Sequence, residues 1–175
     1  MKMIHFPTTR LSEMVARAGG VSRSDAVEGA MAQMESMRGE SDNVIEAAIS
    51  AVEAVALAAS ARGKFTKAQM LDILRYGDQI VTLAGTFGYA PLDIASRSLC
   101  DVTDGLLGAG LDDPAPILVH VQAIRMMAPR ATPLKTEEIE KILAELKKVS
   151  AHFNFGPLSQ TAGACEFEEV ATVTS

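Results

Sequence analysis

The 175-residue chain has no tryptophan, only two cysteines and few aromatic residues, which make up 5% of the sequence. Hydrophobic residues nevertheless account for 48% of it, so a core has to be built from aliphatic side chains and the nine methionines. This composition favours packed helices over a β-sandwich, whose strands are rich in aromatic and β-branched residues. The length fits one domain with additional segments rather than two complete domains.

Signals of common chemistry are also missing. Cys100 and Cys165 are isolated, and the three histidines are scattered, so the sequence predicts two structural thiols and no metal site. The 22 acidic residues against 16 lysines and arginines give a net charge of -6, which argues against non-specific DNA binding. No phosphate-binding glycine loop, catalytic triad or paired acid and base is recognisable. We therefore expect neither a metabolic enzyme nor a bound cofactor.

No uninterrupted apolar run approaches the ~20 residues that a membrane span needs. Arg62, Lys64 and Lys67 are among the charged residues that interrupt the richest stretch. The first seven residues lack the continuous apolar core of a signal peptide. We expect a cytoplasmic protein, in which both thiols are reduced.

Helical periodicity begins early in the chain. Residues Ser24–Met37 predict a short, methionine-rich helix that Gly39 should end. A second helix should start at the N-cap residues Ser41-Asp42-Asn43 and run to Gly63, with apolar residues every three or four positions.

The third helix has the clearest local signals. Thr66 and Gln69 form a capping box, and the helix should extend to Phe87, where Gly88 supplies the C-terminal break. Its predicted core-facing residues recur at helical spacing. They are Met70, Ile73, Leu74, Gly77, Ile80, Val81, Ala84 and Phe87.

Three more helices follow at short intervals. Pro91 suits the first turn of a fourth helix that ends at Gly108-Ala-Gly110, and Asp112-Asp113-Pro114 restarts the chain for a fifth helix over Ile117–Met127. After a linker, Thr136–Val149 predicts a charged helix with a narrow apolar stripe. Helices joined by short loops favour an all-α fold, namely an antiparallel up-down-up-down four-helix bundle with extra N-terminal and C-terminal helices.

The predicted organisation has four parts. Residues 1–40 form an N-terminal segment with the methionine-rich helix, and residues 41–128 form the bundle. Residues 129–155 contain the linker and the charged helix, and residues 156–175 are expected to be a flexible tail, in which Val170–Thr174 has a strand-like composition.

The segment Gly77-Asp-Gln-Ile-Val-Thr-Leu-Ala-Gly-Thr-Phe-Gly88, followed by Tyr89–Cys100, resembles the motif of histidine-phosphotransfer (HPt) domains. That motif is written roughly H-x-x-K-G-x-x-x-x-x-G and is followed by a helix of the type x-L-x-x-x-A-x-x-L. Only the second half matches, because Asp78 stands at the phosphoacceptor position and Val81 at the lysine position. The resemblance covers residues 41–128 and implies an HPt-like four-helix bundle without the phosphoacceptor histidine.

A narrower similarity, to small accessory proteins encoded in alphaproteobacterial chemotaxis operons, rests on three strings. These are Ile80–Gly88, Ser98–Asp101 and Val119–Arg125. This similarity implies a cytoplasmic signalling protein that contacts components of a phosphorelay without carrying the phosphate.

The resemblance also implies a binding site. HPt domains dock a response-regulator receiver domain through the helix that carries the phosphoacceptor motif. The corresponding residues are mostly polar or small: Arg75, Asp78, Gln79, Thr82 and Gly85. We therefore predict a non-catalytic adaptor that binds a receiver domain or a histidine kinase. The alternative for this motif is that Gly85 and Gly88 only let two helices pack and turn.

Two other functions stay open. The protein is an active phosphotransfer protein if His120 or Asp78 accepts a phosphoryl group, although Asp78 then needs a metal and nearby cations. His120 has no glycine or lysine downstream at the expected spacing, which favours a partly buried packing histidine. The protein is a homodimeric assembly module if the methionine-rich helix and residues 136–149 pair between chains.

The methionines leave a related choice open. Met31, Met34, Met37, Met126 and Met127 either form an adaptable binding surface or fill gaps in a helical core.

Overall fold

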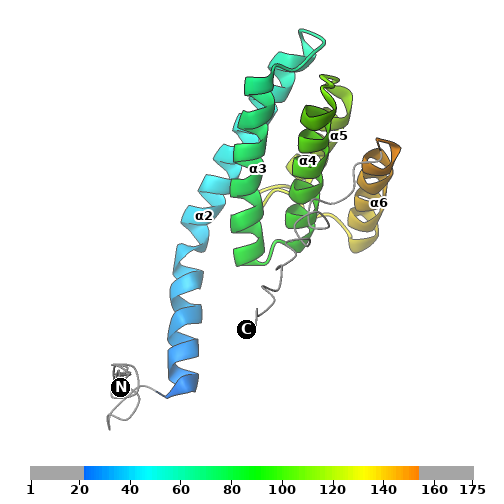
Figure 1. The fold of residues 1–175 in the computed structure, drawn as a ribbon. Helices are drawn as coiled ribbons and strands as arrows, with labels where there is room; N and C mark the ends of the chain where they lie inside the picture. The colour runs from blue at the N-terminus through cyan, green and yellow to red at the C-terminus, as the bar shows by residue number, and fades with distance from the viewer. Residues whose placement is uncertain (1–21, 154–175) are drawn as a thin grey trace, which may run out of the picture. The chain divides into compact units, whose positions relative to one another are not determined.

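The computed structural model describes residues 22–153, and this part of the chain contains helices and no β-strand. The predicted all-α class is therefore confirmed. The helices are α2 (Arg23–Ser60), α3 (Lys67–Phe87), α4 (Ala90–Ala109), α5 (Ala115–Met126) and α6 (Thr136–His152), as Figure 1 shows. The predicted tail, including the strand-like Val170–Thr174, lies outside the described residues.

The chain divides into two compact units after Arg38, inside α2. In the first unit the described residues form the beginning of α2, and every side chain from Ser22 to Met37 is exposed. Large apolar side chains are among them: Val27 is 51% exposed, Met31 66%, Met34 44% and Met37 52%. The interpretation as core gap-fillers is therefore wrong for Met31, Met34 and Met37, and also for Met126, which is 47% exposed, whereas Met127 is half-buried against the core.

The predicted break at Gly39 is also wrong, because α2 continues through it. Among the described residues the glycines with positive φ are Gly63, Gly88 and Gly110, so Gly39 keeps a negative φ. Ser41 is buried within the helix and does not cap a new one. A helical glycine costs only about 1 kcal/mol relative to alanine, and good helix formers flank this one. The helix ends instead at Ser60, just before Gly63, whose φ of 73° suits a helix terminus.

The second unit has one hydrophobic core, to which every helix contributes. The part of α2 after Gly39 adds residues at helical spacing, and α4 packs against α3, α5 and α6. The largest fully or almost fully buried aliphatic side chains are Ile45, Ile49, Val52, Ile73, Ile80, Leu92, Leu99, Leu106, Ile117, Ile124 and Leu146. The aliphatic core expected from the composition is thus present in this unit.

Helix α3 begins and ends as the sequence predicts. The backbone N–H of Gln69 donates to Thr66 Oγ1 over 3.3 Å, and the backbone N–H of Thr66 donates to Gln69 Oε1 over 3.0 Å. Gly88 closes the helix with a φ of 79°. The predicted core-facing residues are buried except Leu74 and Val81, which are half-buried.

The last two helices also follow the sequence closely. Asp113 Oδ1 accepts a hydrogen bond of 2.9 Å from the backbone N–H of Ala115, at the start of α5. Helix α6 extends three residues beyond the predicted Val149, to His152. It packs against α4 and α5, but Leu146 is its only fully buried residue. α6 is therefore the least buried helix of this unit.

Candidate functional site

The five residues predicted to bind a partner lie along α3, and all of them are exposed. We call this set the α3 face: Arg75, Asp78, Gln79, Thr82 and Gly85. Their spacing of one, three or four residues places them on one side of the helix, away from the buried Met70, Ile73 and Ile80. The structure thus places the sequence-predicted residues together on an accessible surface.

The α3 face presents few free hydrogen-bond donors at its centre. The hydroxyl of Thr82 donates to the carbonyl oxygen of Asp78 over 2.8 Å, and Thr86 makes the same bond to Thr82. The threonine methyl groups and Gly85 therefore form much of the surface that follows Asp78 and Gln79 along the helix. Because these side chains are small, the backbone of another protein can approach the helix closely.

Arg75 stands at one end of the α3 face. Its guanidinium pairs with Asp72 over 3.3 Å and lies 4.7 Å from the centre of the Tyr76 ring. Both contacts come from the same helix and hold the cation against the surface. An exposed pair of this kind adds little stability, so Arg75 is accessible to a partner at low cost.

Two glycines of α3 face α4, and only one of them is sterically required. A Cβ atom at Gly77 would lie 2.6 Å from Cys100 Sγ, whereas one at Gly85 would lie 3.8 Å from Asp93 Oδ1. The first distance is a clash and the second an ordinary contact. The alternative, in which Gly85 and Gly88 let two helices pack and turn, is confirmed for the turn at Gly88, whose φ is 79°. The close packing of α3 on α4 requires Gly77 and not Gly85, and the place of Gly77 on the predicted buried face was the available signal.

Cys100 lies directly behind the α3 face. Its thiol is buried, 3.9 Å from Asp78 Oδ1. The pKa of the Cys100 thiol is raised to about 12, mainly by burial and in addition by the negative charges of Asp78 and Asp101. The thiol therefore stays protonated at neutral pH and is a poor nucleophile. Cys165 lies outside the described residues.

His120, the rival phosphoacceptor, is more deeply buried than the sequence suggested, with no exposed surface. Its Nδ1–H donates to the carbonyl oxygen of Pro116 over 2.7 Å, and Nε2 lies 2.9 Å from Ser98 Oγ. Burial lowers the pKa of His120, and the bond to Pro116 opposes part of this shift. The neutral ring therefore has both nitrogens engaged and neither one facing solvent.

The bond from His120 continues into α6. Ser98 Oγ lies 3.1 Å from Ser150 Oγ, and the Ser150 hydroxyl is 3.2 Å from the carbonyl oxygen of Leu146. This chain of polar groups joins α5, α4 and α6. Buried polar groups that are hydrogen-bonded in this way fix the relative positions of the helices, so the structure supports a packing role for the histidine.

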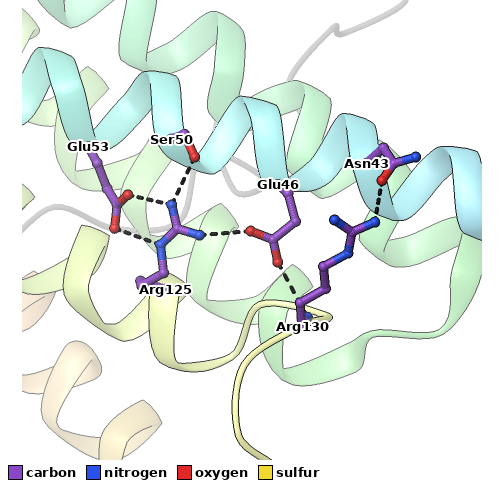
Figure 2. Close-up of polar contacts among 6 residues, drawn as sticks. All are labelled: Asn43, Glu46, Ser50, Glu53, Arg125 and Arg130. Atoms are coloured by element: carbon purple, nitrogen blue, oxygen red, sulfur yellow. Dashed lines mark hydrogen bonds and ion pairs between the residues drawn. The ribbon is translucent and has the colours of Figure 1, made fainter.

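Arg125 makes ion pairs between helices that the sequence analysis did not predict. Figure 2 shows its guanidinium between Glu46 and Glu53 of α2. Nε donates to Glu53 Oε1 over 2.7 Å and Nη1 to Glu46 Oε2 over 2.8 Å, while Nη2 bonds Glu53 and Ser50. These hydrogen bonds, led by those of Glu53, raise the pKa of Arg125. The arginine thus clamps α5 onto α2.

A second arginine extends the clamp, as Figure 2 also shows. The backbone N–H of Arg130 donates to Glu46 Oε1 over 3.3 Å, and its side chain bonds Asn43. The available signal was the seven-residue spacing of Glu46 and Glu53, which places both on one side of α2. Their partner is the only residue of opposite charge in α5.

Helix α2 is long and apolar enough to cross a membrane by length and composition alone. An 18-residue window in it has a mean hydropathy of 1.4, and 33% of that window is buried. Core helices pass the same test, so this observation is weak evidence for a span. Ile45, Ile49 and Val52 are core residues here, and Glu46 and Glu53 pair with Arg125.

A groove runs between α4 and α6, with a volume of 610 Å³. Ile94, Leu143 and Ala144 contribute to its apolar walls, and Ser98 and Ser150 line it as well. Charged side chains of Arg97, Asp101 and Lys147 also border it. We call it the α4–α6 groove. Within residues 22–153 no cluster of three or more histidine, cysteine or acidic side chains is arranged to hold a metal ion.

No protein-family model matches the chain, and neither a curated protein nor a solved structure matches it. The HPt resemblance therefore stays a prediction from the motif.

Proposed function

We propose that this protein is a non-catalytic adaptor of a two-component or chemotaxis system, which binds a receiver domain or a histidine kinase through the α3 face. In this proposal α3, α4, α5 and the part of α2 after Gly39 form an antiparallel HPt-like bundle. The binding residues are Arg75, Asp78, Gln79, Thr82 and Gly85. Their joint exposure on one side of α3 is the observation that carries the proposal.

The physical chemistry of the α3 face favours binding over phosphotransfer. Phosphoryl transfer requires a placed nucleophile and cations that stabilise the developing negative charge. The position of the HPt histidine holds the carboxylate of Asp78, and the position of the lysine holds the half-buried, apolar Val81. The absence of both groups from the α3 face supports binding without phosphotransfer.

The alternative acceptor His120 has no route to a partner in this structure. Its side chain has no exposed surface, and its two nitrogens contact Pro116 and Ser98. A phosphoryl donor reaches it only after α5 separates from α4. This supports the adaptor over the phosphotransfer alternative.

Binding is best tested by calorimetric titration with isolated receiver domains and the kinase domains of the host's sensor proteins. We expect Asp78→Arg and Gly85→Arg to weaken the complex at least about tenfold, which corresponds to about 1.4 kcal/mol. Ala54→Arg is the matched control, because Ala54 is an exposed alanine on α2. All three variants should keep the unfolding temperature of the wild type. Equal affinities of wild type and both α3-face variants would contradict the proposal.

A further inference from the structure

The described part of the chain exposes an apolar stripe at the beginning of α2. Val27, Met31, Met34 and Met37 follow the i, i+4, i+7, i+10 spacing of one helix side, and each is more than two-fifths exposed. We call these four residues the methionine stripe. Contiguous exposed apolar surface of this kind marks a binding site in many proteins, and unbranched methionine side chains adapt to the partner's shape.

The α4–α6 groove has the complementary form. It lies between two helices, and its apolar lining comes from Ile94 on α4 and Leu143, Ala144 and Ala151 on α6. Grooves of this type receive one amphipathic helix, which inserts side chains at i, i+4 and i+7. Residues Arg23–Arg38 form about 24 Å of helix and α6 about 26 Å, at 1.5 Å per residue, so the two surfaces match in length.

Charge favours the same match. Glu28 and Glu35 lie seven residues apart along one edge of the methionine stripe, and both are exposed. Arg97 and Lys147 provide cations at the α4–α6 groove, on a chain whose net charge is -6. Such pairs at the edge of an interface add specificity more than affinity. Glu35 also pairs with Arg38, and Arg97 with Asp93, within their own helices. The opposite charges of Glu28 and Lys147 therefore account for most of this match.

We propose that the methionine stripe of one chain docks in the α4–α6 groove of a second copy of the chain. Each chain then carries one donor surface and one acceptor surface, which are different in kind. The interface is accordingly heterologous and not a pairing of identical stripes. This proposal goes beyond the adaptor function, because it involves none of the α3-face residues and is tested without a signalling partner.

Light scattering on two complementary full-length variants tests it. Met31→Glu damages the stripe and leaves the groove intact, whereas Ala144→Glu damages the groove and leaves the stripe intact. We expect wild type to have a mass above the chain mass of 18.5 kDa, each variant alone to be monomeric, and their equimolar mixture to give a dimer of twice the chain mass. Ala32→Glu, on the opposite side of the same helical segment, is the control and should assemble like wild type.

Other occupants of the two surfaces give different results, and each of them overturns the proposal. If two stripes pair instead, Ala144→Glu alone forms a dimer, because its stripe is intact, whereas Met31→Glu alone stays monomeric. A wild-type chain that is monomeric at all concentrations, and assembles only when residues 154–175 are removed, has its groove filled by that segment. A monomeric wild type under both conditions leaves the groove to another protein.

Circular dichroism checks that the variants remain folded. Met31 is 66% exposed and Ala144 is also exposed, so neither substitution should change helix content or the unfolding temperature. A loss of assembly with an unchanged spectrum then reports on the interface.

Discussion

The two parts of α2 both carry apolar residues at helical spacing, but they differ in whether these residues are exposed or buried. Before Gly39 the helix exposes its apolar side chains, including Met31 and Met34, whereas after Gly39 it buries Ile45, Ile49 and Val52 completely. Both parts show apolar residues at helical spacing. The difference is that the second part packs against other helices of its unit, and the described residues give the first part no such cover.

The charged residues show the same contrast. In the first part Glu35, which is 66% exposed, pairs over 2.9 Å with Arg38 of the same helix. In the second part Glu46 and Glu53 pair with Arg125 of α5. Tertiary partners thus mark the part of the helix that builds the core. The methionine stripe lies in the other part, where its four side chains are exposed.

The largest expected change in the free energy of unfolding comes from shortening a side chain in the buried part of α2. Ile49→Ala removes three carbon atoms from a fully buried side chain, and we expect it to lower the free energy of unfolding by about 2–5 kcal/mol. Met34→Ala, in the exposed part, should change it by less than about 0.5 kcal/mol. Urea denaturation of the two variants measures both values. Similar losses for Ile49→Ala and Met34→Ala would erase the distinction between the two parts of α2.

The next effect concerns glycines in the packed and the exposed regions. Gly77→Ala places a Cβ atom 2.6 Å from Cys100 Sγ and should cost about 1–3 kcal/mol. Gly29→Ala meets nothing within 4 Å and should stabilise the helix by about 0.5–1 kcal/mol. Chemical denaturation measures the first change and helix content by circular dichroism the second.

A double variant checks the cause of the first change. Cys100→Ala removes the sulfur atom that Gly77→Ala would contact, so the pair together should cost less than the sum of the two single substitutions. Additive costs would show that the clash is not the reason.

A smaller effect separates the two arginine sites. Arg125→Ala leaves Glu46 and Glu53 close together without their cation, and we expect a loss of about 1–2 kcal/mol, reduced by the 35% exposure of the arginine. Arg38→Ala breaks the pair with Glu35 of the same helix, at a side chain that is 37% exposed, and should cost less than about 0.5 kcal/mol. Thermal unfolding of both variants measures the two losses. Equal shifts in unfolding temperature would contradict the expected difference between Arg125 and Arg38.

The smallest effect is a dependence of stability on pH through His120. Its folded pKa lies below the unfolded value of 6.5, so the unfolded chain binds more protons between these two values. The stabilising contribution is therefore complete above 6.5 and is lost as the pH falls through the folded pKa. Urea denaturation between about pH 8 and 5 should show this loss for wild type and not for His120→Gln. Parallel profiles for the two proteins would remove His120 as its source.

Local signals of the sequence predicted most helix ends well. The Thr66 and Gln69 capping box and Gly88 fixed α3, because both act through neighbouring residues. Gly39 misled the prediction, since the cost of one helical glycine is small compared with the other contributions along a 38-residue helix.

The candidate sites were predictable only where they depend on one helix. The α3 face follows from helical spacing within α3, and the structure shows its residues exposed. The contacts of Arg125 with α2 and of Gly77 with Cys100 join residues far apart in the sequence. Spacing within one helix contains no information about the register of its neighbour, and so neither contact was predicted.

The central claim is that this chain binds a phosphorelay component without accepting its phosphate, and one measurement addresses it directly. Full-length protein is incubated with a receiver domain that it binds, after that domain has been phosphorylated with a radioactive label, and the label on each protein is followed over time. The account predicts a complex in which all label stays on the receiver or is released as inorganic phosphate. Label on Asp78, or acid-labile label on His120, would contradict it.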